Sequence, residues 1–316
     1  MQIKEDFEIK NHTTYKIGGK VKKVYFPESQ EEFSALLREL DDYIVLGGCS
    51  NVIFSSNGYD GNLIFTTEIK EFEINGNRVF VSCGVKAPLL SQKVAEHSLT
   101  GMEFLIGLPG TIGGAVYMNA GAHRQAISDT LISCTLFDKE TKEIIIKQKE
   151  DLEFGYRKSV LQNGRYIILS AEFELKQGNK NEIKELMTHN LSFRKSIQPS
   201  LAYPNAGSVF KNPENDSAGK LLDAAGVKEI MAENLSGSSN ESTKIYTPVR
   251  VWDKHANFIV NKGGATSEDV LELMAKMKNA VKEKFGIELM PEQIFLGNMS
   301  EKEEELWNIL YKKSQK

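Results

Sequence analysis

The chain has 316 residues, a length that suggests two domains of about 150 residues each. Its composition of 41% hydrophobic and 26% charged residues, with 25 Gly and 8 Pro, is typical of a globular protein and excludes collagen-like, disordered and coiled-coil chains. The formal charge of −4 leaves no basic excess for binding a phosphate backbone, so we expect no nucleic-acid partner.

Further classes of protein are excluded by the N-terminal segment and by the cysteine and histidine positions. Residues 1–16 contain no apolar signal-peptide core, and no run of apolar residues is long enough for a membrane span, so we expect a cytoplasmic protein. The three cysteines, Cys49, Cys83 and Cys134, lie far apart, and the histidines lack metal-ligand spacing. We therefore predict neither a disulfide framework nor a metal site.

Short β-rich segments alternate with helices in the first part of the chain. Residues 21–26 predict a strand. The capping box formed by Ser29 and Glu32 predicts a helix that continues to Leu40. Further strands are predicted singly and in two hairpins: residues 43–46, 71–74 with 78–82, 131–137 with 143–147, and 166–175. The pattern thus predicts a high and partly antiparallel β content.

The pattern changes after a polar stretch at residues 176–182, which predicts a domain boundary. A helix is predicted over residues 183–196, directly after this stretch. Another helix is predicted between its opening residues, Thr266 and Ser267, and the stop signal Gly286.

The last segments of the chain give weaker signals. Residues 287–297 predict a terminal strand that Pro291 partly interrupts. The tail after residue 299 predicts a short surface helix, with a partner-binding helix as the alternative. The serine-rich segment 235–243 predicts a mobile loop.

Two glycine-rich segments are the strongest chemical signal. Residues 47–51 read GGCSN after a predicted strand, and residues 107–114 read GLPGTIGG. A glycine backbone can approach a phosphate closely and present its amides, so both segments suit a pyrophosphate, although each alone is also compatible with a structural turn. Both the Rossmann fingerprint and a complete P-loop are absent, so any nucleotide is held in another way.

Ser208 stands out in the segment YPNAGSVFKNP. A hydroxyl on such a turn can serve as a nucleophile, a proton donor or a turn cap. The segment lacks the second glycine of a G-x-S-x-G motif, which disfavours acyl transfer. By composition alone, Arg157 in FGYRKS and Glu292 in the final strand are surface charges.

The chain resembles the UDP-N-acetylenolpyruvoylglucosamine reductases, flavoenzymes of bacterial peptidoglycan precursor synthesis, in eight segments that occur in the same order. These segments are TTYKIGG, GGCSNVIFSSNGYDG, GMEFLIGLPGTIGGAVYMNAGA, FGYRKS, AYPNAGSVFKNP, SAGKLLDAAG, HANFIVN and PEQIFLG. They extend from about Asn11 to Gly297, nearly the whole chain.

The resemblance implies an α+β fold with non-covalent FAD and with NADPH as cofactors. It implies an FAD-binding domain of the vanillyl-alcohol-oxidase type, made of two subdomains, over residues 1–178. A smaller α+β substrate-binding domain follows over residues 179–298, and residues 299–316 form a C-terminal tail. The implied substrate is the small molecule UDP-N-acetylglucosamine enolpyruvate, and we expect a monomer.

The family's catalytic arginine, serine and glutamate match Arg157, Ser208 and Glu292. In the implied reaction NADPH reduces the flavin, and flavin N5 then gives a hydride to C3 of the enolpyruvyl group, forming UDP-N-acetylmuramate. Ser208 protonates C2, Arg157 stabilises the enolate, and Glu292 orients or helps to protonate that intermediate.

The resemblance also assigns binding residues. Those for the FAD pyrophosphate are Gly47, Gly48, Cys49, Ser50, Asn51, Pro109, Gly110, Thr111, Gly113 and Gly114, and a side chain at Gly113 is expected to intrude on the pyrophosphate. Those for the substrate are Tyr156, Arg194, Lys211 and Asn212. The alternatives are that Tyr156 is a packing residue and that Arg194 is a solvated helix residue.

The sequence departs from the family pattern at two places, and two other functions are compatible with it. Cys49 stands where the family commonly has Gly, and residues 227–254 depart from the family pattern. A flavin oxidase with the same FAD domain is one alternative, and His123 is the histidine nearest the glycine segments for a covalent flavin link. The other is a non-catalytic protein that binds a flavin or sugar nucleotide.

Overall fold

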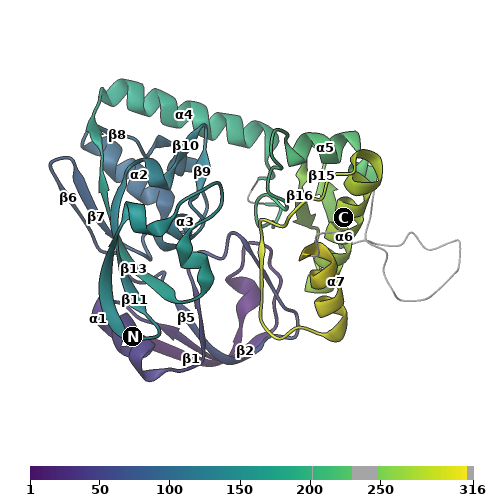
Figure 1. Ribbon diagram of the computed structural model, residues 1–316, viewed down its shortest axis with the longest axis horizontal. Coiled ribbons are helices and arrows are strands. Elements are labelled where there is room, and N and C mark those ends of the chain that lie inside the picture. Colours follow the sequence, from purple (N-terminus) through teal and green to yellow (C-terminus); the bar gives the residue numbers. More distant parts are fainter. Residues whose placement is uncertain (201, 230–247, 312–316) are drawn as a thin grey trace, which may run out of the picture. The chain divides into compact units, whose positions relative to one another are not determined.

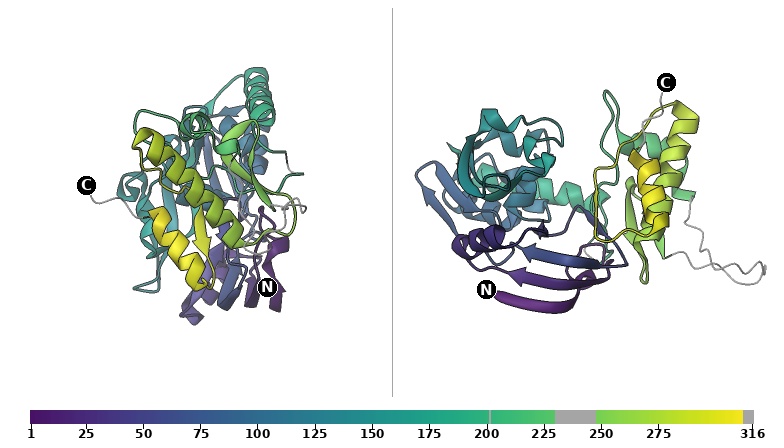
Figure 2. Two further views of the ribbon diagram at one scale, coloured as in Figure 1. Left: turned by 90° about the vertical axis from the view of Figure 1, so that its right-hand side faces the viewer. Right: turned by 60° about the horizontal axis from the view of Figure 1, so that its bottom comes forward.

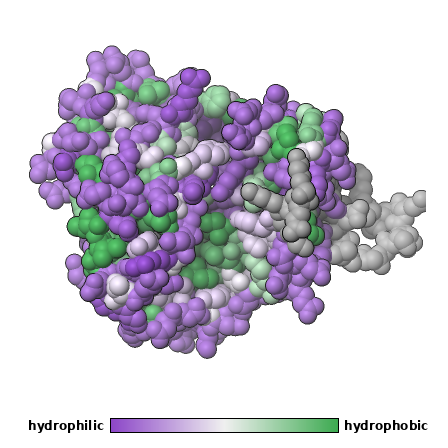
Figure 3. Space-filling model, in the orientation of Figure 1, coloured by the Kyte–Doolittle hydropathy of each residue, from purple (hydrophilic) through white to green (hydrophobic). Residues whose placement is uncertain are grey.

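The computed structural model describes residues 1–200, 202–229 and 248–311. The serine-rich segment 235–243, for which a loop is predicted, lies outside these residues. Within them, no helix has the length and hydropathy that crossing a membrane requires. Hydrophilic residues cover most of the face seen in Figure 3, and hydrophobic residues gather there in a few patches.

Contacts divide the chain into two compact units, each assembled from separate segments. The first unit comprises Met1–Phe7, Lys22–Gly48 and Gly61–Ser196. The second unit comprises Glu8–Val21, Cys49–Asp60 and Ile197–Lys316. By this division, the main boundary between the units lies at the end of a long helix, after Ser196. The polar stretch predicted the boundary within residues 176–182.

Helix α4 (Lys180–Ile197) accounts for this difference. Its buried residues Ile183 and Met187 pack against Ala95 and Ile106 of the first unit. Because an apolar stripe at helical spacing must be covered, the helix stays with the unit that covers it. The assignment of FAD binding to residues 1–178 and of substrate binding to residues 179–298 stays a prediction.

The first unit contains a four-stranded sheet in the order β1-β2-β5-β3, drawn in purple and blue in Figure 2 (right). Its strands are β1 (Gln2–Glu8), β2 (Lys20–Phe26), β5 (Tyr59–Phe65) and β3 (Tyr43–Leu46). The rings of Phe26 and Phe65 stack on it, 5.3 Å apart. Helix α1 (Gln30–Glu39) begins at Ser29 as predicted, but it ends before Leu40, whose backbone is extended. Only half of the capping box forms, because the Glu32 carboxylate accepts from the Glu28 amide instead.

A five-stranded antiparallel sheet, in the order β12-β11-β13-β7-β6, forms the rest of the core of the first unit. Its strands are β6 (Phe72–Asn75), β7 (Arg78–Ser82), β11 (Leu131–Asp138), β12 (Glu143–Gln148) and β13 (Tyr166–Glu174). Both predicted hairpins are confirmed: Asn75 pairs with Arg78, and Asp138 pairs with Glu143. The first of these turns uses Gly76 at φ 59°, a conformation that favours glycine.

Short elements complete the first unit (Figure 1). They are α2 (Ala87–Glu96), α3 (Ile112–Tyr117), and the strand pairs β8 (Leu99–Thr100) with β14 (Lys176–Gln177) and β9 (Gly121–Ala122) with β10 (Gln125–Ala126). Helix α3 contacts strands β7 and β13 of the five-stranded sheet. This packing matters for the site because α3 directly follows the second glycine segment.

The second unit packs helices against two small sheets. Its elements are β4 (Val52–Phe54), α5 (Ala218–Ala224), β15 (Val249–Trp252), β16 (His255–Asn261), α6 (Ser267–Phe285), β17 (Ile294–Leu296) and α7 (Glu301–Tyr311). Helix α6 has the predicted cap at Thr266 and the predicted left-handed end at Gly286. The predicted terminal strand shortens to β17, since proline has no amide to donate and Pro291 makes only an isolated bridge with Phe210.

The C-terminal tail forms the predicted short helix, α7, and most of its residues are exposed while one face is covered. Helix α7 runs along α6 (Figure 2, left), and Leu310 is fully buried in the core of the second unit, with Trp307 packed against it. The buried ammonium of Lys278 donates to the carbonyl of Leu310 at 2.6 Å. The amphipathic pattern of the tail therefore covers this unit's own core.

Candidate functional site

The two glycine-rich segments contact one another in the first unit. A Cβ atom at Gly48 would lie 2.8 Å from Cα of Gly110, and one at Gly47 would overlap the Thr111 hydroxyl. Side chains at these positions would force the segments apart. Glycine is therefore required here by the joint between the segments, in addition to any contact with a ligand.

Around helix α3, neighbouring glycines have different roles. The amide of Gly113 donates to the carbonyl of Cys83 at 2.8 Å, and a Cβ at Gly113 would lie 2.8 Å from Cβ of Cys83. A side chain there would thus intrude on the protein core, which corrects the reason predicted from sequence. At Gly114, by contrast, a Cβ would meet only the Thr111 hydroxyl, at 3.8 Å. The space beside Gly114 that remains open, next to the contact between the two glycine segments, suits a phosphate group.

Positive charge gathers elsewhere in the first unit. Arg157 adopts φ 53°, donates to the Gly121 carbonyl at 3.1 Å, and lies 5.3 Å from the ring centre of Tyr156. The Arg194 side chain lies against Gly107. Burial and the charge of Arg157 lower the pKa of Arg194, which makes no ion pair within the described part of the chain.

His123 belongs to the same positive region. Burial, then the charge of Arg194, then that of His189 lower the pKa of His123. Its ring lies 5.5 Å from that of Phe193, edge to face. An anion would offset this concentration of positive charge. Of the two predicted substrate residues here, Tyr156 is 55% exposed and Arg194 is half-buried, and their role in binding stays a prediction.

Ser208 and Glu292 lie on neighbouring segments of the second unit. The amide of Glu292 donates to the carbonyl of Val209 at 2.8 Å, and the side-chain amide of Asn51 donates to the carbonyl of Glu292 at 3.0 Å. A Cβ atom at Gly207 would lie 3.7 Å from the carbonyl oxygen of Ser50. The fold thus gathers four predicted site residues: Ser50, Asn51, Ser208 and Glu292. Arg157 belongs to the first unit.

Gln293 is a supporting residue that the sequence analysis missed. It is fully buried, and its side-chain amide donates to the carbonyls of Ala206 at 3.2 Å and Gly207 at 3.3 Å. It also lies within hydrogen-bond distance of the buried Tyr15 hydroxyl. The turn before Ser208 is therefore held from inside the core. The sequence did contain a signal for this role. Gln293 alternates with the apolar residues Leu289 and Phe295 in the predicted strand 287–297, which indicates a buried side chain that needs hydrogen-bond partners.

The predicted substrate residue Asn212 also has a structural contact. Its side-chain oxygen accepts from the amide of Ala218 at 3.0 Å and so caps the start of α5. The amide of Lys211 donates to the carbonyl of Met290 at 2.9 Å, which extends the pairing beside Glu292. Both residues thus follow Ser208 on a segment whose backbone is fixed.

Cys49 occupies a strained backbone position. Its φ is 50°, in the left-handed region that favours glycine, and its carbonyl accepts from both the amide and the hydroxyl of Thr14. This conformation gives a physical reason for the glycine that the resembling family commonly has at this position. The thiol is buried, so it cannot extend into the solvent.

We expect the folded protein to resist thiol alkylation. Burial raises the pKa of Cys49, Cys83 and Cys134 to about 12, so at pH 8 only about one thiol in ten thousand is ionised. The thiolate is the reactive form. Mass spectrometry after iodoacetamide treatment should find no adduct on the native protein and all three adducts in guanidinium chloride. Fast native modification of Cys49 would contradict the observed burial.

Comparisons with known proteins show the family of this chain. A family model described as "FAD binding domain" matches residues 21–146, and one described as "UDP-N-acetylenolpyruvoylglucosamine reductase, C-terminal domain" matches residues 198–296. Over 302 residues the chain is 38% identical to the UDP-N-acetylenolpyruvoylglucosamine reductase of Caldicellulosiruptor bescii, which covers 94% of this chain and 91% of the relative. The chain belongs to the UDP-N-acetylenolpyruvoylglucosamine reductase family.

Two further relatives extend this comparison. UDP-N-acetylenolpyruvoylglucosamine reductase 2 of Bacillus cereus is 37% identical over 303 residues, covering 95% of this chain and 94% of its own. The crystal structure of UDP-N-acetylenolpyruvylglucosamine reductase from Thermus caldophilus matches with a TM-score of 0.77 at 32% identity, covering 93% of this chain and 99% of that chain. The predicted family, its α+β fold with an FAD-binding domain, and its enzymatic character are confirmed.

The residues present in this family member fit an FAD pyrophosphate. The glycine segments meet closely at Gly48 and Gly110, and Gly114 leaves an open side next to the capping residue Thr111. The amides of Ile112 and Gly113 donate to the carbonyls of Val85 and Cys83. These two amides are therefore already used, and a phosphate would have to be bound by other residues of this segment.

Proposed function

We propose that this chain reduces the enolpyruvyl group of UDP-N-acetylglucosamine enolpyruvate with NADPH, giving UDP-N-acetylmuramate for peptidoglycan synthesis. The observation that carries the proposal is the pairing of Glu292 with the segment of Ser208, through the hydrogen bond to Val209, in a chain of this family. A carboxyl group and a hydroxyl on adjacent segments can hold and move a proton at one substrate carbon.

In this proposal the glycine segments hold FAD through Gly47, Gly48, Gly110, Thr111 and Gly114. Bound FAD supplies the hydride that reaches C3 of the enolpyruvyl group. Ser50 and Asn51 continue the first of these segments into the second unit. The closely approaching glycine backbones exclude water around the diphosphate and neutralise it with amide dipoles.

In this proposal, different side chains stabilise the negative charge and supply the proton. Negative charge that develops at C2 spreads into the neighbouring carboxylate, and Arg157 stabilises it, with Arg194 adding positive charge nearby. Ser208 then donates its proton to C2, so the hydride at C3 and the proton at C2 together saturate the double bond. Glu292 orients the substrate or returns the proton to Ser208. Tyr156, Lys211 and Asn212 bind the substrate.

A two-step anaerobic titration tests this function. NADPH should bleach the yellow protein, and the enolpyruvyl substrate should restore the colour. UDP-N-acetylglucosamine, which lacks the enolpyruvyl group, is the matched control and should leave the protein bleached. Recolouring by oxygen alone would identify a flavin oxidase, and a protein that NADPH never bleaches would be the non-catalytic binding protein.

We expect all of the flavin to be released when the protein is precipitated with acid. His123, the nearest histidine to the glycine segments, packs against Phe193 and lies in the positive region near Arg194. Absorbance at the flavin wavelengths should appear only in the supernatant, and colour in the pellet would show a covalent link.

The location and oligomeric state belong to the same proposal. A cytoplasmic enzyme acting as a monomer is expected, with residues 1–178 binding FAD and residues 179–298 binding the substrate. Light scattering on a size-exclusion column should give a mass near 35.4 kDa.

A further inference from the structure

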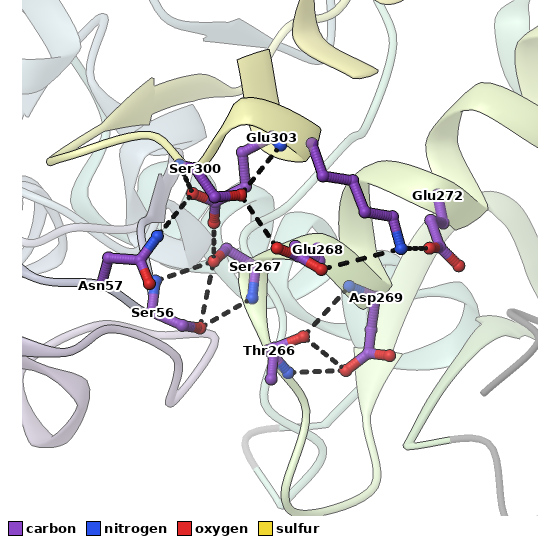
Figure 4. A network of polar contacts seen from close by, with 10 residues as sticks. Ser56, Asn57, Thr266, Ser267, Glu268, Asp269, Glu272, Ser300 and Glu303 are labelled. Carbon is purple, nitrogen blue, oxygen red and sulfur yellow. Dashed lines mark hydrogen bonds and ion pairs between the residues drawn. The ribbon is translucent and has the colours of Figure 1, made fainter. Parts of the chain in front are cut away.

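Helix α7 carries a buried carboxylate beyond the residues that the family model matches, which end at residue 296. Glu303 is 1% exposed. Its side chain accepts hydrogen bonds from the Asn57 side-chain amide at 3.3 Å, the Ser300 amide at 2.8 Å and the Ser267 hydroxyl (Figure 4). The Ser55 hydroxyl also lies within hydrogen-bond distance of this carboxyl group, at 3.0 Å. Within the described residues it has no ion-pair partner, so neutral groups alone form its hydrogen bonds.

Ser267 connects this carboxylate to a third segment of the chain. The Ser267 hydroxyl accepts from the Ser56 amide at 2.7 Å, and the Ser267 amide donates to the Ser56 hydroxyl at 2.9 Å. The single proton of the Ser267 hydroxyl has two acceptors in reach, the Ser56 hydroxyl at 3.0 Å and the carboxyl group of Glu303, of which Glu303 is the nearer. The carboxyl group of Glu303 therefore links Asn57, the start of α6 and the start of α7, as the dashed lines in Figure 4 show, and Ser55 lies within reach of the same group.

These contacts lie at one end of the β4–β17 strand pair and extend its hydrogen bonding beyond the last paired residues. The two strands are parallel and share only three residue pairs, the last of which joins Phe54 to Leu296. Directly beyond it, the Ser55 amide donates to the Leu296 carbonyl at 2.8 Å, and the Ser55 hydroxyl lies 2.6 Å from the Asn298 carbonyl. A strand pair this short is weak by itself, so the contacts at its end contribute strongly to its register.

The proposed catalytic carboxylate lies at the other end of the same pair. There the Ile294 amide donates to the Asn51 carbonyl at 3.0 Å, and the Asn51 side chain donates to the carbonyl of Glu292 at 3.0 Å. A shift of β17 along β4 would break both bonds. It would also move Glu292 relative to Val209 and hence to Ser208.

We infer that Glu303 is a positioning residue: it fixes the register of β4 and β17 and thereby places Glu292 beside Ser208. The inference rests on the proposed function for its catalytic consequence. The structural part stands on the hydrogen bonds of Glu303, Ser55 and Ser267. Breaking the network leaves buried polar groups without partners, so its members act as a unit.

The experiment compares Glu303→Ala with Glu304→Ala in the full-length protein. Glu304 is the adjacent carboxylate on the same helix, but it is exposed. In Glu303→Ala, hydrogen exchange at the amides of Glu292 and Ile294 should accelerate at least tenfold, as a shift of β17 requires. Recolouring by the enolpyruvyl substrate should slow by roughly 10- to 100-fold, the range that small misplacements cause. Bleaching by NADPH should stay within twofold, and Glu304→Ala should match the wild type in all three measurements.

The outcomes separate this inference from the proposed function. Unchanged exchange and recolouring in Glu303→Ala would overturn the inference, as would equal effects in Glu304→Ala. If Glu303→Ala does not fold, Glu303→Gln keeps the size of the side chain and should show the same changes at smaller amplitude; a Gln variant identical to the wild type would also overturn the inference. If the wild type itself is not recoloured by the substrate, the proposed function fails, while the exchange measurement still decides the role of Glu303.

Discussion

Ser208→Ala should slow recolouring by the enolpyruvyl substrate at least 100-fold while NADPH bleaches the protein at close to the normal rate. The first half-reaction needs no proton from this hydroxyl, whereas the second needs one at C2. Positioned general acids contribute about 10²- to 10⁴-fold, or roughly 3 to 5 kcal/mol of barrier. The fold should survive, because Ser208 is half-buried and the turn before it is held by Gln293.

Rapid-mixing absorbance measurements of each half-reaction separately provide the test. Ser217→Ala, at an exposed serine of the same unit, is the matched control and should behave as the wild type. Equal slowing of both halves in Ser208→Ala would point to a misplaced flavin. Normal recolouring would show that Ser208 is only a turn residue, with Glu292 or water supplying the proton.

Gly113→Val should lose flavin and stability together. Its Cβ would lie 2.8 Å from Cβ and 3.1 Å from the carbonyl oxygen of Cys83, so helix α3 would have to move away from the sheet. Overpacking of this kind costs about 1–3 kcal/mol. Since α3 starts at Thr111, which contacts Gly47, the same movement would open the joint between the glycine segments.

Gly114→Ala separates packing from cofactor binding at the neighbouring position. An alanine Cβ there would meet only Thr111, at 3.8 Å, so the melting temperature should not fall. Flavin affinity should weaken, because the methyl group would fill the open space beside Gly114. Flavin absorbance after gel filtration and thermal unfolding measure the two effects.

Full flavin occupancy with normal stability in Gly113→Val would contradict the packing observed against Cys83.

Local patterns were sufficient for elements whose signals lie within a few residues. The hairpin at Asn75 and Arg78 follows from a glycine turn between alternating strands, and α6 follows from its cap and its glycine stop. The family followed from eight ordered segments along nearly the whole chain, because such a set is far more specific than any one segment alone. Arg157 and Glu292 were candidates only through that resemblance, whereas Ser208 also stood out by the turn on which it lies.

Contacts between distant segments were decided by the tertiary structure. The capping box at Ser29 was half replaced because the Glu28 amide competes for Glu32, and Gly113 turned out to face Cys83. The tail proved to be part of the core of the second unit, since Leu310 finds its apolar surroundings there. A sequence states which residues are apolar or charged, but burial and hydrogen-bond partners depend on which remote segments the fold brings together. For that reason the resemblance could name Glu292 as a candidate, and only the structure showed that Glu303 contacts the end of the strand pair next to it.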